Sequence, residues 1–143
     1  MKEITFNKDQ VIFRQGEFGS AMYDVLSGEI GIYTDYQGAD EKQIAVIKAG
    51  EVFGEMGLIE VYPRSATAVV LTDGTVVIEL KEDDLRAYLQ DKPEKLLQVM
   101  RQLSSRIRET TEKYVDVCRA VSDRHRAQSD LNFYADQYSN YWY

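Results

Sequence analysis

The sequence has very few of the residues that build metal centres and covalent cross-links. Cys118 is the only cysteine and His125 the only histidine among its 143 residues. A single cysteine excludes an intrachain disulfide, which suits a reducing compartment, and Cys118 is interpreted as a small residue on a helix face. One cysteine and one histidine cannot form a Cys/His metal cluster, and a histidine-based catalytic triad has no obvious partner set.

Long apolar runs are also missing. No stretch approaches the roughly 20 apolar residues that a membrane-spanning helix needs, and the first ten residues, MKEITFNKDQ, lack the apolar segment of a signal peptide. These absences predict a soluble cytoplasmic protein without a membrane partner. A length of 143 residues suits one domain with a small appendage.

Glycine and charge are unevenly spread. All nine glycines lie at or before Gly74, so the rest of the chain has none. Residues 1–100 carry 10 basic and 18 acidic side chains, whereas residues 101–143 carry 7 basic and 6 acidic side chains. The acidic first part is a poor general partner for nucleic acid, because phosphates need lysine and arginine. Any anion that it binds must be held by a local set of donors.

Short strands separated by turns are predicted over residues 4–80. Ser27-Gly28 is a turn signal, residues 35–42 form a polar loop, and two strands flank the turn at Asp73-Gly74. Strands at such regular spacing, without long helices between them, indicate an antiparallel barrel or jelly roll. The strand candidates are residues 11–13, 23–26, 29–33, 44–47, 66–71 and 76–80.

The glycine-free part of the chain has the pattern of helices. Residues 82–89 form a short helix candidate, and Asp91, followed by Pro93 and Glu94, signals the start of a long helix. Apolar residues then recur with heptad spacing, with Thr110 as the polar break. The seam residues are Leu96, Met100, Leu103, Ile107, Tyr114, Val117 and Val121.

This narrow seam has two interpretations. The helix packs along its own barrel, or it pairs with a second copy of the chain. A stripe so regular over about three heptads favours pairing, and we expect a parallel homodimer through residues 94–121.

Beyond Val121 the seam is lost. Ser129-Asp130 predicts the cap of one more short helix, and the last ten residues hold four of the ten tyrosines and the only tryptophan. These rings either cover apolar surface of the same protein, which is favoured, or form a docking surface for a partner or a lid on a ligand.

Residues 50–67, GEVFGEMGLIEVYPRSAT, carry the predicted chemistry. Gly54 and Gly57 permit close backbone approach to a ligand, and residues 55–59 suit one helical turn with free N–H groups. Arg64 adds a guanidinium that holds phosphate in a bidentate manner. Glu55 would repel a phosphate, but it suits a hydroxyl such as that of a ribose, or Arg64 when the site is empty.

The run FGEMGLIEVYPRSATA resembles the phosphate-binding cassette of cyclic nucleotide-binding domains, and the upstream run VIFRQGEFGSAMYDVLSGEIGIY resembles the first strands of that family. The resemblance covers about residues 5–121. It implies a mainly β fold with α: an antiparallel β-roll or jelly-roll barrel, a short helix and a long C-terminal dimerisation helix. Residues 1–121 would form this domain and residues 122–143 a short aromatic-rich tail. Asp9 departs from the family, which usually has glycine there.

The resemblance also implies roles for site residues. Glu55 would bind the ribose 2′-hydroxyl, and Arg64 would pair with the cyclic phosphate. Ser65, where threonine is frequent in members selective for cyclic GMP, would contact a phosphate oxygen, which favours cyclic AMP with cyclic GMP as the alternative. The backbone of three residues would line the pocket, and two side chains would pack near the sugar and base: these are Gly54, Met56 and Ala66, and Phe53 and Val46.

Two further ligand contacts are implied on the long helix. In the catabolite activator branch of the family, two consecutive hydroxyl residues of the dimer helix contact adenine, one from each protomer. Thr110 and Thr111 match these positions. The alternative is that threonine at this point of the seam only tunes helix register.

The expected function is therefore that of a dimeric cyclic nucleotide sensor, with cyclic AMP as ligand, that signals by repositioning its helix and is not an enzyme. About 22 residues follow Val121, without glycine or a basic stripe. They are too few for a winged helix-turn-helix domain, so we expect no direct nucleic acid binding and a protein partner at the tail. The alternatives are a transcription regulator of the catabolite activator type or a sensory fragment of one, a phosphodiesterase with Glu55 as base, and a cassette that has changed or lost its ligand.

Overall fold

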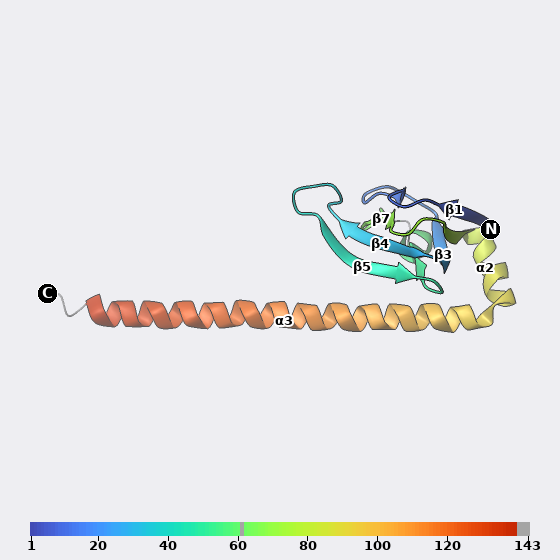
Figure 1. Ribbon diagram of the computed structural model, residues 1–143. Coiled ribbons are helices and arrows are strands. Elements are labelled where there is room, and N and C mark those ends of the chain that lie inside the picture. The colour runs from blue at the N-terminus through green and yellow to red at the C-terminus, as the bar shows by residue number, and fades with distance from the viewer. Residues whose placement is uncertain (61, 140–143) are drawn as a thin grey trace. The chain divides into compact units, whose positions relative to one another are not determined.

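The computed structural model describes residues 1–60 and 62–139, with side chains described as far as residue 129. It confirms a mainly β fold with a short helix and a long C-terminal helix (Figure 1). The elements in chain order are β1 (Lys2–Phe6), β2 (Val11–Phe13), β3 (Ala21–Ser27), β4 (Glu29–Thr34), β5 (Lys42–Lys48), β6 (Val52–Phe53), α1 (Glu55–Ile59), β7 (Thr67–Val70), β8 (Thr75–Lys81), α2 (Glu82–Asp91) and α3 (Pro93–Ser139).

The strands form two four-stranded antiparallel sheets, in the orders β1-β8-β3-β6 and β2-β7-β4-β5. The predicted turns at 27–28 and 73–74 are present, and Gly28 and Gly74 have positive φ angles of 86° and 70°. Each turn carries the chain from one sheet into the other instead of closing a hairpin, because β3 and β4 lie in different sheets, as do β7 and β8.

Two buried apolar clusters hold the sheets and α2 together. The first includes Val25, Phe53 and Val77, and the second includes Met22 and the α2 residue Tyr88. Because side chains alternate along a strand, β3 sends Val25 to one cluster and Met22 to the other. Strand β3 is therefore buried on both faces, and like β6 and β8 it contributes residues to both clusters.

Asp9, which stands where the family usually has glycine, has a backbone conformation that favours glycine. Its φ angle is +67°, in the left-handed region where glycine carries no steric penalty. The turn is nevertheless held, since the Asp9 amide donates a hydrogen bond to the Val70 carbonyl at 2.8 Å. An aspartate tolerates this conformation better than most side chains do, so the turn survives the substitution.

The predicted short and long helices are present as α2 and α3, but the separate helix expected to begin at Ser129-Asp130 is wrong. Helix α3 runs without interruption to Ser139. The sequence from residue 94 to residue 139 contains no glycine or proline, so nothing there stops the helix. The predicted role of the tyrosine-rich tail concerns side chains that lie outside the described residues.

Contacts divide the chain into two units, Met1–Met100 and Arg101–Tyr143, which are described separately below. Among the residues that the structure describes, no helix combines the length and apolar character needed to cross a bilayer.

Candidate functional site

The side chain of Arg64 is buried, with only 6% of its surface exposed. Its Nη1 donates a hydrogen bond to the Gly54 carbonyl at 2.7 Å, and its Nη2 donates to the Ala21 carbonyl at 2.6 Å. The guanidinium carbon lies 4.2 Å from the centroid of the Phe13 ring. Within the described residues, the buried Nε of Arg64 has no hydrogen-bond partner. A buried donor without an acceptor is unfavourable, and an anion placed here would supply the acceptor.

Three glycines make room for this guanidinium. A Cβ atom at Gly19 would lie 2.6 Å from Nη2, one at Gly57 would lie 2.6 Å from Nη1, and one at Gly54 would lie 2.9 Å from Nη1. Gly54 and Gly57 are predicted from the sequence to permit close backbone approach to a ligand, and in the structure the group that lies close to them is Arg64. Gly19 is not predicted from the sequence, because a glycine in a turn gives no sign of which distant side chain it faces.

Glu55 is the second charged residue of the site. The predicted helical turn is present as α1, which Gly54 begins as its N-cap with φ 75°, and Glu55 in its first turn is 3% exposed. Burial lowers the pKa of the Arg64 guanidinium, while the negative charges of nearby groups, Glu55 among them, act in the opposite direction. Both predicted residues are therefore buried, and the charge of Glu55 favours the charged form of Arg64.

The other predicted pocket residues differ in exposure. Ala66 is buried, whereas Met56, Ser65 and the β5 residue Val46 are exposed. Phe53 is buried in the barrel core, where its ring stacks on that of Tyr23 at a centroid distance of 5.1 Å. The roles of these residues toward a sugar, base or phosphate stay predictions.

Thr110 and Thr111 lie on the exposed surface of α3, in the second unit. Their hydroxyl groups donate hydrogen bonds to the carbonyls of Arg106 and Ile107, at 2.8 and 2.9 Å. Such bonds to the preceding helical turn leave the hydroxyl oxygens able to accept from another group. Their contact with adenine stays a prediction.

The structure thus brings together a buried arginine, a buried glutamate and three glycines around the guanidinium, an arrangement with the chemistry to hold an anion. The family model described as "Cyclic nucleotide-binding domain" matches residues 3–92 of this sequence, a range that contains the whole cassette. The chain belongs to the cyclic nucleotide-binding domain family. The resemblance inferred from the cassette is confirmed.

Among curated relatives, the "Cyclic AMP receptor protein" of Thermus thermophilus is 36% identical over 98 residues, which cover 68% of this chain and 45% of the relative. The "CRP-like cAMP-activated global transcriptional regulator" of Mycobacterium tuberculosis is 26% identical over 117 residues, which cover 82% of this chain and 52% of the relative. The chain thus spans about half the length of these relatives.

Solved structures agree with this assignment. The catabolite activator protein of Thermus thermophilus superposes with a TM-score of 0.67 and 30% identity, over 78% of this chain and 52% of that one. A cyclic nucleotide-binding domain from Methylobacillus flagellatus gives a TM-score of 0.62 and 29% identity, over 78% of this chain and 64% of that one. The jelly-roll architecture of the family therefore accounts for the two sheets described above.

Proposed function

We propose that this chain is a cyclic AMP-binding sensor module. The observation that carries the proposal is the buried Arg64, whose Nε has no partner among the described residues and which lies beside the buried Glu55. The names of the relatives, which include a cyclic AMP receptor protein, support cyclic AMP over cyclic GMP.

In this proposal, Arg64 holds the cyclic phosphate and Glu55 accepts a hydrogen bond from the ribose 2′-hydroxyl. The two roles fit the chemistry of the groups, because a guanidinium donates to phosphate oxygens and a carboxylate accepts from a hydroxyl. Glu55 is not a catalytic base here, and the module binds the nucleotide and releases it unchanged.

The module acts as a homodimer that signals by repositioning α3. Support comes from the apolar seam, which is exposed on the isolated chain at Ile107, Tyr114, Val117 and Val121. Four large apolar side chains with heptad spacing on one helix are typical of helix pairing. Thr110 and Thr111, the proposed adenine contacts, lie on the same helix.

Isothermal titration calorimetry with cyclic AMP and cyclic GMP tests the ligand. Wild-type protein should saturate with cyclic AMP, and Glu55→Ala and Arg64→Ala should each lose about 1.5–3 kcal/mol of binding free energy, the usual loss for a hydrogen bond to a charged group. Arg86→Ala, at an exposed arginine of α2, is the matched control and should bind normally. Absence of saturation at hundreds of micromolar nucleotide would reject the proposal, as would unaltered binding by the two site variants.

A transcription regulator is the second candidate, because the Mycobacterium tuberculosis relative carries that description and this chain spans half of it. We propose that these 143 residues do not bind DNA themselves, since their net charge is −7 and disfavours phosphate contact. Electrophoretic retardation of DNA at physiological salt, with and without cyclic AMP, should show no shift. A specific shift would favour the regulator.

A further inference from the structure

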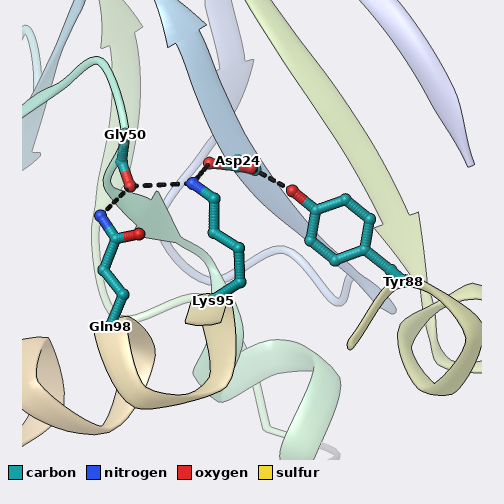
Figure 2. Close-up of polar contacts among 5 residues, drawn as sticks. All are labelled: Asp24, Gly50, Tyr88, Lys95 and Gln98. Atoms are coloured by element: carbon teal, nitrogen blue, oxygen red, sulfur yellow. Dashed lines mark hydrogen bonds and ion pairs between the residues drawn. The ribbon is translucent and has the colours of Figure 1, made fainter. Parts of the chain in front are cut away.

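A buried carboxylate lies outside the nucleotide site. Asp24, on β3, is fully buried and accepts two charge-assisted contacts from different helices (Figure 2). The Tyr88 hydroxyl of α2 donates to its Oδ2, and the Lys95 Nζ of α3 lies 2.9 Å from its Oδ1. The Lys95 side chain is itself only 15% exposed. Buried ion pairs add little net stability, but they fix one relative position of the elements that carry them.

The same lysine also holds the turn between β5 and β6. Lys95 Nζ donates to the Gly50 carbonyl at 3.1 Å, and Gln98 Nε2, one turn further along α3, donates to the same oxygen (Figure 2). The Gly50 amide donates in turn to the Val25 carbonyl of β3 at 2.7 Å. The turn at Gly50 is thus bonded both to β3 and to the first turns of α3.

This turn leads directly into the nucleotide site. Gly50 is followed by β6, which ends at Phe53 and delivers Gly54 and Glu55 to the start of α1. In the pairing of β3 with β6, Asp24 lies opposite Val52. The two acceptors of the Lys95 ammonium therefore border the strand that positions the cassette.

Strand β3 makes a second connection to the site. The Ala21 carbonyl of β3 accepts the hydrogen bond from Arg64, and Asp24 stands three residues further along the same strand. Three residues of a strand span roughly 10 Å. An anion that draws the Arg64 guanidinium toward itself competes with the Ala21 carbonyl, so the strand holding Asp24 is one of the first elements to be affected.

We propose that Lys95 and Gln98 are positioning residues that couple the cassette to α3: through the Gly50 carbonyl and the Asp24 carboxylate, they convert ligand-induced displacement of β3 and β6 into movement of the first turns of the helix. The inference rests on the proposed function, since it needs a ligand at Arg64. Neither residue touches the nucleotide in this mechanism.

Hydrogen–deuterium exchange on the full chain, with and without saturating cyclic AMP, tests the coupling. In wild-type protein, the nucleotide should change exchange in the cassette, residues 54–66, and in the first turns of α3, residues 93–100. Gln98→Leu removes one donor to Gly50 and keeps the Asp24–Lys95 pair. It should retain the cassette change and lose most of the α3 change. Gln90→Leu, at an exposed glutamine of α2, is the matched control and should behave as wild type.

A second pair of variants guards against misfolding. Lys95→Met alone leaves Asp24 buried without its counter-charge, whereas Asp24→Asn with Lys95→Met removes both charges together. The double variant should also keep the cassette response and lose the α3 response. If either Gln98→Leu or the folded double variant keeps a wild-type exchange response in α3, the coupling is overturned. A cassette response in wild-type protein without any response in α3 would overturn it as well. If wild type shows no change in the cassette either, the proposed function fails and the coupling falls with it.

Discussion

At Arg64, the protein holds a positive charge away from water by giving it acceptors from its own backbone. Burial lowers the pKa of this guanidinium, but the carbonyls of Gly54 and Ala21 accept two of its N–H groups at 2.7 and 2.6 Å. The geometry depends on three neighbouring positions having no side chain, since a Cβ atom at any of them would lie within 3 Å of the guanidinium. Substitutions that add even one methyl group beside Arg64 should therefore lower the affinity for cyclic AMP strongly.

Gly57→Ala is the sharpest such change. The new Cβ would lie 2.6 Å from Arg64 Nη1 and 2.9 Å from the Gly19 carbonyl oxygen, so either the arginine or the backbone must shift. Alanine favours the helix of α1 by about 1 kcal/mol, but we expect cyclic AMP affinity to fall at least tenfold, about 1.4 kcal/mol, in calorimetric titration.

The control for that variant is Gly38→Ala in the β4–β5 loop, where the three atoms nearest the added Cβ all belong to the side chain of Asp35. Rotation of that side chain would cost the hydrogen bond that it accepts from the Asp40 amide, but Arg64 is not among these atoms, so binding should be unchanged. Wild-type affinity in Gly57→Ala would show that the position of the guanidinium does not limit binding.

Tyr88 predicts a dependence of stability on alkaline pH. Burial and the hydrogen bond to Asp24 raise the pKa of its hydroxyl above the ordinary value. Above about pH 10 the unfolded phenol loses its proton while the folded one keeps it, so the free energy of unfolding falls as pH rises. Tyr88→Phe should lower that free energy by about 1.5–3 kcal/mol at pH 7 and flatten its decline above pH 10.

Urea unfolding at pH 7 and at pH 11 provides this measurement. Tyr62→Phe, at an exposed tyrosine outside the buried network and outside the seam of α3, should leave both the value and the decline unchanged. An identical alkaline decline in wild type and Tyr88→Phe would contradict the assignment of the phenol to the buried network.

At the scale of elements, helices and turns that depend on neighbouring residues could be predicted from the sequence, whereas the contacts between distant elements could not. The helical turn α1 and the start of α3 follow from glycine, proline and acidic residues within a few positions. The hydrogen bond of Arg64 to Ala21 joins residues 43 positions apart, and that of Lys95 to Asp24 joins residues 71 apart. No local sequence pattern encodes such pairs, because the order of strands in the sheets determines which distant residues come into contact.

The predicted cap at Ser129-Asp130 failed for a related reason. Serine and aspartate cap a helix only where the backbone leaves helical geometry, and elsewhere they are tolerated within it. With no glycine or proline between residues 94 and 139, α3 continues through them. A capping signal therefore needs an accompanying helix terminator before it predicts a new element.

The exposed seam of α3 gives a prediction about assembly. Ile107 is 68% exposed in the single chain and lies on the heptad stripe. Ile107→Lys places a charge in the proposed dimer interface, so sedimentation equilibrium should show a shift from dimer to monomer. Glu112→Lys introduces the same side chain at an exposed position off the stripe and should remain dimeric. A wild-type chain that sediments as a monomer would refute pairing through this helix.

At the scale of the whole molecule, ligand binding should appear as global stabilisation. A ligand that binds only the folded state at a hundred times its dissociation constant adds about 2.7 kcal/mol to the free energy of unfolding. Differential scanning calorimetry should therefore show a rise in Tm with cyclic AMP, and Arg64→Ala should lose most of it at the same concentration. An equal rise with inorganic phosphate would show that the sugar and base contribute nothing.

The carbonyls that hold Arg64 also bear on selectivity in a crowded cell. Because Gly54 and Ala21 already accept from two of its N–H groups, an anion at this site gains the Nε–H group, which has no partner among the described residues, and competes with these carbonyls for the other two. A weakly accepting ion such as chloride would compete poorly with these carbonyls, whereas in the proposed site a cyclic phosphate whose sugar also reaches Glu55 would gain at two points. The proposed arrangement would therefore favour a cyclic nucleotide over simple anions at this site.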